Sequence, residues 1–199
     1  MTGRFDTAQA FRNALDDRLR NAAKRRNVPL ETLRTKVLIE RLLARLFARP
    51  GVPWLLKGGY SLEMRFRPKA RTTRDIDLSV ESQREVPLRE RLEDVRNRLQ
   101  EAAELDLGDF LRFEIGAPTA ELQGPPLGGG SFPVVVRLAG KEFGRYHIDV
   151  GFGDARIGES EELIGDDLLA FAELAPARVL AIPRAQQFAE KIHAYTRPR

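Results

Sequence analysis

Two acidic residues two positions apart, Asp75 and Asp77, have the clearest potential for chemistry in the sequence. The segment 75–80 alternates polar and apolar residues, which predicts a β-strand. Because side chains of a strand alternate between its faces, we expect Ile76 and Leu78 to face the core and both carboxylates to face the other side, about 7 Å apart. Two such carboxylates repel each other unless a cation lies between them. The pair therefore predicts a Mg²⁺ site that also binds substrate phosphates.

A glycine pair precedes this strand, in the run Lys57-Gly58-Gly59-Tyr60-Ser61. The pattern predicts a short strand at 54–56, a turn, and a short helix at 60–66. Glycines at such a junction would let a triphosphate approach backbone N–H groups and the helix N-terminus. A tight turn without a ligand is the alternative for the glycine pair alone. The candidate nucleotide-binding residues are Lys57, Gly58, Gly59, Ser61, Arg71 and Arg74.

Asp149 is the candidate for a third carboxylate, because two-metal phosphoryl or nucleotidyl transfer needs a base or a ligand near the attacking hydroxyl. In the strand predicted at 145–150, Asp149 lies on the face opposite to the apolar residues. It can therefore join the two aspartates from a neighbouring strand, the alternative being a structural or exposed role. We expect His147, on the same face, to be a surface or core residue and not a catalytic one.

The elements that must position these residues follow from the hydrophobic periodicity. Apolar residues at helical spacing predict amphipathic helices at 7–25, with Thr7 as a cap, and at 29–47, with Pro29 in the first turn. After Pro50-Gly51 the pattern changes to short strands that alternate with helices, which indicates an α/β or α+β sheet domain. Further strands are expected at 111–115, 133–138, 145–150 and 179–182, and further helices at 86–105 and 183–195.

Three regions are expected along the chain: an N-terminal helical segment at 1–50, a core domain at 51–182, and the start of a C-terminal helical region at 183–199. Within the core domain, residues 116–131 contain a proline pair and a run of three glycines. Such a composition predicts a mobile loop with no chemistry of its own.

Composition excludes several classes of protein. The chain has no Cys and two His, which excludes disulfides, thiolate zinc sites, iron–sulfur clusters and cysteine nucleophiles. A metal, if used, should be a hard cation held by carboxylates. No apolar run approaches the roughly 20 residues of a membrane helix, and the first residues lack the layout of a signal peptide. We therefore expect a cytoplasmic protein with no membrane partner.

Charge is unevenly distributed along the chain. Residues 1–100 carry 23 Lys and Arg against 13 Asp and Glu, whereas residues 101–199 carry 10 against 16. Part of the basic excess lies on one face of the helix predicted at 29–47, which holds Arg34, Lys36, Arg41 and Arg45. The basic half predicts a surface for a polyanion such as RNA or a nucleotide, with a solvated helix face as the alternative.

Several motifs together resemble a known family. Lys-Gly-Gly-x-x-Leu from Lys57, followed by Arg-x-x-Arg-Asp-Ile-Asp-Leu from Arg71, is similar to the pattern of the AbiEii/AbiGii-type toxin nucleotidyltransferases. These belong to the DNA polymerase β-like nucleotidyltransferase superfamily, which includes the mycobacterial MenT toxins. The segment Ile-Asp-Val-x-x-Gly-Asp at 148–154 and the helix around Ala189–Ala194 are also similar to that family. The resemblance spans about residues 30–196.

The resemblance implies an α+β fold with a nucleotidyltransferase-like mixed sheet flanked by helices. It assigns Gly58, Gly59, Asp75 and Asp77 to nucleotide and metal binding, and Lys191 matches a functional lysine of the late helix. It further implies a Mg²⁺-dependent toxin that transfers NMP from an NTP to an RNA, with the 3′ end of tRNA as the expected acceptor. A cognate antitoxin is the implied protein partner.

One part of the family pattern is not in this sequence. Members usually continue past the late helix into an Arg-x-Lys-Asp-x-x-Asp segment whose aspartate contributes to activity, whereas this sequence ends at Arg197-Pro198-Arg199. Either the sequence is a fragment or the protein lacks a catalytic component.

Two further functions compete with the toxin enzyme. A catalytically degenerate module could bind nucleic acid or a protein partner on the same fold, with carboxylates that no longer support turnover. A small-molecule nucleotidyltransferase of the aminoglycoside-modifying kind would use the same active site, and an acidic pocket for a polycationic acceptor would favour it.

Overall fold

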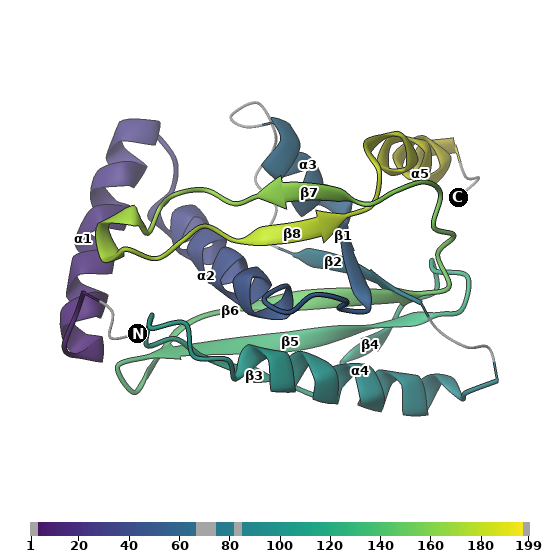
Figure 1. Cartoon of the computed structure of the whole chain (residues 1–199), viewed down its shortest axis with the longest axis horizontal. Helices are drawn as coiled ribbons and strands as arrows, with labels where there is room; N and C mark the ends of the chain where they lie inside the picture. Colours follow the sequence, from purple (N-terminus) through teal and green to yellow (C-terminus); the bar gives the residue numbers. More distant parts are fainter. Residues whose placement is uncertain (1–3, 67–74, 82–84, 197–199) are drawn as a thin grey trace.

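The computed structural model describes residues 4–66, 75–81 and 85–196. It shows an α+β fold in which helices flank a single mixed sheet of eight strands, so the predicted fold class is confirmed (Figure 1). The strands follow the order β3-β5-β6-β2-β1-β8-β7, and β4 pairs with β5. Among the described residues, no helix combines the length and the apolar character needed to cross a bilayer.

The elements form at the places where periodicity predicts them, with three additions. The helices are α1 (Ala8–Arg26), α2 (Leu30–Leu46), α3 (Gly58–Phe66), α4 (Leu88–Ala103) and α5 (Arg184–Thr196), with a 3₁₀ turn η1 at Ala170–Ala172. The strands are β1 (Trp54–Lys57), β2 (Ile76–Val80), β3 (Arg112–Ile115), β4 (Ala120–Glu121), β5 (Gly129–Leu138), β6 (Lys141–Phe152), β7 (Glu161–Ile164) and β8 (Arg178–Ala181). The turn η1 and strands β4 and β7 are the additions.

The residues at the ends of α1 and at the start of α2 follow the usual preferences for helix termini. Thr7 is extended, with φ −140°, and its Oγ1 accepts a hydrogen bond from the backbone N–H of Ala10 at 3.1 Å, which makes it the N-cap of α1. Asn27 ends α1 in the left-handed conformation, which Asn tolerates better than most residues. Pro29 immediately precedes α2, so that its missing N–H costs the helix no hydrogen bond.

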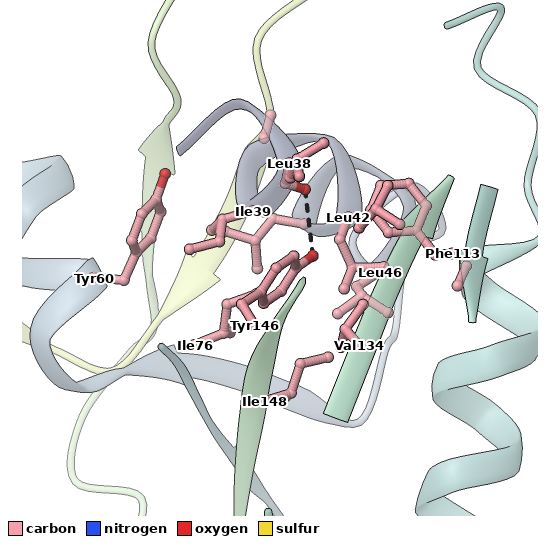
Figure 2. Packing of buried hydrophobic residues seen from close by; sticks show 14 of the residues in the cluster. Leu38, Ile39, Leu42, Leu46, Tyr60, Ile76, Phe113, Val134, Tyr146 and Ile148 are labelled. Atoms are coloured by element: carbon pink, nitrogen blue, oxygen red, sulfur yellow. Dashed lines mark hydrogen bonds between the residues drawn. The ribbon is translucent and has the colours of Figure 1, made fainter. Parts of the chain in front are cut away.

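Helix α2 packs on one face of the sheet and fills the core. Its side chains Leu38, Ile39 and Leu42 lie against residues of the central strands, among them Tyr146 and Ile148 of β6 (Figure 2). The Tyr146 hydroxyl donates a hydrogen bond to the Leu38 carbonyl at 3.4 Å, and burial raises its pKa well above the usual value. Helix α4 covers the same face further along β5 and β3 (Figure 1). The opposite face of β2 and β6 is therefore left to polar residues.

Strands β5 and β6 are longer than predicted and form the central hairpin. Their turn uses Ala139 (φ 53°) and Gly140 (φ 73°), and two residues with positive φ give the turn that matches the twist of a two-residue hairpin. Glycines at 129 and 130 hide the start of β5 from periodicity analysis, yet they pair with 151 and 150 of β6. The ends of both strands therefore extend to the site described below.

The basic face of α2 is buried, which contradicts both the RNA-facing and the solvated interpretation for three of its residues. Arg41 and Arg45 both bind the carboxylate of Asp109, at 2.7 and 2.6 Å, and all three residues are at most 4% exposed. Lys36, 8% exposed, binds Glu63 at 3.1 Å. Because these charges are compensated inside the protein, they are not available to a nucleic acid.

Candidate active site

Three charged side chains lie in one row across the centre of the sheet. Lys57 at the end of β1 is paired in register with Asp77 of β2, and Asp77 is paired in turn with Asp149 of β6. Residues in register on neighbouring strands point to the same face, with strands about 4.8 Å apart. All three are partly exposed, whereas Ile76 and Ile148, which point to the α2 face, are 0% exposed. The predicted alternation of β2 and β6 is confirmed.

The glycine pair leaves space for the Asp77 carboxylate and donates a hydrogen bond to it. Helix α3 begins at Gly58 itself, so the separate turn that was predicted before the helix is not formed. Gly58 has φ 66°. A Cβ atom on Gly58 would lie 1.8 Å from Asp77 Oδ2, so only glycine admits the carboxylate at this place. The backbone N–H of Gly59 donates a hydrogen bond to Asp77 and lowers its pKa. The N–H of Gly59 thus binds a carboxylate of the protein itself.

Replacing Gly58 by Ala tests this close approach. We expect Gly58→Ala to lower the free energy of unfolding by about 2–4 kcal/mol, because the variant combines a strained positive φ with a clash against Asp77. Gly51→Ala is the matched control, since Gly51 has φ 75° and no atom within 4 Å of its Cβ position. It should lose only about 1 kcal/mol for the backbone conformation. Equal losses in urea unfolding of the two variants would contradict the close approach.

Burial and carboxylate repulsion make Asp77 costly to ionise in the absence of a cation. Burial first, and then the charge of Asp149, raise the pKa of Asp77 to about 6, while the charge of Lys57 opposes this change. Asp149 Oδ1 is buried and has no hydrogen-bond partner among the described residues. A cation bound between the two carboxylates would remove the repulsion and supply the missing partner.

The raised pKa of Asp77 predicts a specific pH dependence of stability in metal-free buffer. The folded carboxyl keeps its proton up to about pH 6, whereas the unfolded chain releases it near 3.8. Stability from this group is therefore present below pH 3.8, falls between the two values, and is lost above about pH 6. We expect Asp77→Asn to become more stable than the parent across this window, by up to about 3 kcal/mol. The free energies of unfolding of Asp77→Asn and the parent are compared in urea. A difference between them that stays constant from pH 4.5 to 7.5 would contradict the prediction.

A cleft with a volume of about 910 Å³ opens over this row. Residues 121–126, which precede β5, form one wall, and α5 forms another through Gln186, Ala189, Glu190 and His193. Part of the segment 116–131, which the sequence predicts to be a mobile loop with no chemistry of its own, therefore lines the cleft. The segment includes strand β4, and Leu122 and Thr119 are held to β5 by backbone hydrogen bonds.

The structure brings together only some of the predicted site residues. Lys57, Asp77 and Asp149 line the cleft. Asp75 is exposed just before β2, and its charge acts weakly on Asp77. Arg71 and Arg74 lie outside the described residues. His147 is exposed on the surface, as predicted.

Ser61 and Lys191 occupy other places. Ser61 is 0% exposed. Its hydroxyl donates to the Gly58 carbonyl at 3.2 Å and contacts Gln187, so Ser61 stabilises the first turn of α3. Lys191 is exposed on α5, one helical turn after Gln187, and it is not among the residues that line the cleft. Its predicted role therefore requires the long side chain to reach toward the glycine pair.

Three residues of the site were missed by sequence reasoning. Asp154 follows β6 and forms an ion pair with Lys57 at 2.5 Å. Gln187 is 4% exposed and donates to the Gly58 carbonyl at 2.6 Å, while Gln186 donates to the Ala155 carbonyl at 2.7 Å. Asp154 ends the Ile-Asp-Val-x-x-Gly-Asp motif at 148–154, which carries the family resemblance but gave this residue no role. Nothing in the pattern of α5 distinguishes the two glutamines from exposed helix residues.

Asp77 and Asp149 fit a divalent cation. Mg²⁺ takes one or two carboxylates and completes its shell with water and phosphate oxygens, and the unpartnered oxygen of Asp149 is a suitable ligand. Within the described ranges there is no group of three or more acidic or His side chains that could enclose a metal alone. The arrangement therefore suits a cation that arrives with a phosphate-bearing ligand.

Comparison with known proteins identifies the fold and the family of the chain. The chain is similar in fold to MenT4, a nucleotidyltransferase toxin from Mycobacterium tuberculosis H37Rv, with a TM-score of 0.60 at 16% sequence identity. The similarity covers 83% of this chain, which spans 53% of the length of MenT4. No curated protein matches the sequence significantly. The sequence profile of the family described as "Nucleotidyl transferase AbiEii toxin, Type IV TA system" matches residues 41–199, well over half of the chain. The chain therefore belongs to the AbiEii family of nucleotidyltransferase toxins.

Proposed function

We propose that the cleft binds a nucleoside triphosphate with Mg²⁺ and transfers its NMP group to an RNA, with the 3′ end of tRNA as the acceptor. The observation that carries the proposal is the row of Lys57, Asp77 and Asp149 beneath a cleft that can hold a nucleotide. Family membership and the MenT-like fold support the same reaction class. As a toxin of this family, the protein would be restrained by a cognate antitoxin.

Each residue of the row has a proposed role. Asp77 and Asp149 would hold the cation, which neutralises the charge of the triphosphate, and Asp75, exposed just before β2, would add negative charge nearby. Lys57 and Lys191 would bind phosphate oxygens, and Gly58 and Gly59 would hold Asp77 in place beside them. Arg71 and Arg74 lie outside the described residues and shortly precede or adjoin Asp75 in the sequence, so these side chains are further candidates for phosphate binding.

The transfer itself follows from these positions. A ribose hydroxyl of the acceptor attacks the α-phosphorus, an oxygen–phosphorus bond forms, and the bond to the β-phosphate breaks, which releases pyrophosphate. Asp149 would accept the proton of the attacking hydroxyl. Most of the rate enhancement would come from positioning and from charge neutralisation, as in phosphoryl transfer generally.

A single assay tests the proposal. The purified protein is incubated with total tRNA and with each of the four α-labelled NTPs in turn, in Mg²⁺ and in excess chelator. We expect label in RNA with at least one NTP, in Mg²⁺ only. No label with any NTP, or label that persists in chelator, would contradict the proposal.

The charge of the cleft favours one alternative acceptor. Besides Asp77 and Asp149, its described lining includes Glu121, Asp154 and Glu190, against one Lys and no Arg. Such a surface would attract a polycationic small molecule, as expected for an aminoglycoside-type nucleotidyltransferase. The same assay with an aminoglycoside in place of tRNA separates the two, because the label then enters the small-molecule fraction. RNA binding that needs neither metal nor nucleotide would instead indicate a degenerate binding module.

A further inference from the structure

The Lys57 ammonium forms an ion pair with Asp154, which lies outside the row of Lys57, Asp77 and Asp149. Lys57 Nζ lies 2.5 Å from Asp154 Oδ2, and their side chains are 18% and 14% exposed. An ion pair that is so far withdrawn from solvent is screened less than a surface pair. Among the described residues that line the cleft, Lys57 has the one Lys or Arg side chain. The direction of this side chain therefore decides where positive charge is placed in the cleft.

Asp154 is held in place from two sides. On one side, β6 is fixed up to its last residue, because Phe152 and Gly128 bond through the backbone at 2.9 Å. On the other side, Gln186 of α5 donates to the Ala155 carbonyl at 2.7 Å and accepts from the Ile157 N–H at 3.0 Å. Gln186 is itself only 8% exposed. The loop that carries Asp154 is thus tied to both the sheet and α5.

Without Asp154, Lys57 would have Asp77 on the neighbouring strand as an alternative partner. Lys57 and Asp77 are in register on neighbouring strands, and the charge of Lys57 already acts on Asp77. A lysine released from Asp154 would be drawn onto the Asp77 and Asp149 carboxylates, where it would occupy the place of a cation. Asp154 opposes this by holding the ammonium at its own carboxylate.

We propose that Asp154 is a positioning residue that keeps the Lys57 ammonium away from Asp77 and Asp149 and directed toward the phosphates of the incoming nucleotide. The inference rests on the proposed nucleotidyl transfer and adds a residue to its machinery. Asp154 acts through Lys57, so its effect depends on the presence of that lysine.

The sign of the effect separates positioning from simple electrostatics. Removal of a negative charge from an acidic cleft should strengthen the binding of a triphosphate if long-range repulsion alone matters. Loss of a positioning residue should weaken it. Glu121→Gln is the matched control, because Glu121 is a carboxylate in the same cleft on strand β4.

The experiment measures Kd for the Mg²⁺ complexes of ATP, GTP, CTP and UTP, and KM and kcat for the NTP that is transferred. We expect Asp154→Asn to raise Kd and KM about tenfold with a change in kcat of less than about threefold. Asp154→Glu should recover part of the loss, and Glu121→Gln should leave KM unchanged or lower it. In a Lys57→Gln background, Asp154→Asn should add less than about twofold. Asp154→Ser takes the place of Asp154→Asn if the latter does not fold.

The possible results are distinguishable. If the parent binds an NTP and Asp154→Asn binds it equally or more tightly, or if its effect persists in full without Lys57, the inference is overturned while the proposed function stands. If the parent binds none of the four nucleotides with Mg²⁺, both are overturned together.

Discussion

Asp77→Asn should lower the rate of nucleotide transfer by at least roughly 10³-fold, which corresponds to several kcal/mol of lost transition-state stabilisation. Asn has the same shape as Asp but carries no charge, so it cannot hold the cation that neutralises the triphosphate. The loss should appear in kcat/KM and should not be restored by higher Mg²⁺. Asp17→Asn is the matched control, because Asp17 is an exposed residue of α1.

The fold of this variant should remain intact. Ionised Asp77 is unfavourable in the metal-free protein, so its neutralisation should raise the thermal midpoint at pH 7.5 and not lower it. An inactive variant with a raised midpoint would separate a chemical role from a structural one. A variant that retains more than a tenth of the parent activity would contradict the assignment of Asp77.

The largest effect on stability is expected at Asp109, which is not among the residues that line the cleft. Asp109→Asn should lower the free energy of unfolding by about 3–5 kcal/mol, because it leaves Arg41 and Arg45 charged and buried without their shared carboxylate. Burial alone would raise the pKa of Asp109, but hydrogen bonds and charges from Arg45 and then Arg41 hold the pKa below its usual value. The carboxylate is therefore ionised throughout the neutral range.

Asp94→Asn is the matched control for this prediction. Asp94 binds Arg98 at 2.9 Å on the surface of α4, where both side chains are more than half exposed. Its loss should cost less than about 0.5 kcal/mol. Urea unfolding at pH 7 compares the two variants, and a loss at Asp109 below 1 kcal/mol would show that the buried charges are compensated in another way.

The sequence carried enough information to place the chemistry of the central strands. Alternation alone put Asp77 and Asp149 on the face opposite to Ile76 and Ile148, and the structure confirms this arrangement. Their pairing in register depends on contacts between segments about 70 residues apart, which no local pattern contains. The adjacency of Asp77 and Asp149 was therefore a reasonable expectation, whereas their exact register was not predictable.

The remaining errors share a physical cause. The charges of Arg41 and Arg45 looked like a solvated helix face because their partner, Asp109, lies more than 60 residues later in the chain. Gln187 looked like an ordinary helix residue because the carbonyl that it binds belongs to Gly58. The importance of a polar side chain depends on its partner, and a partner from a distant segment is visible only in the folded chain.

The proposed transfer depends most on a divalent cation that binds between Asp77 and Asp149 together with a nucleotide. Titration with Mn²⁺, followed by electron paramagnetic resonance, measures this directly in the presence and absence of a non-hydrolysable NTP. We expect the parent to bind Mn²⁺ at least about tenfold more tightly with the nucleotide, and Asp77→Asn and Asp149→Asn to lose this gain. Mn²⁺ affinity that is the same in all three proteins, or that is unchanged by the nucleotide, would contradict a cation site between Asp77 and Asp149.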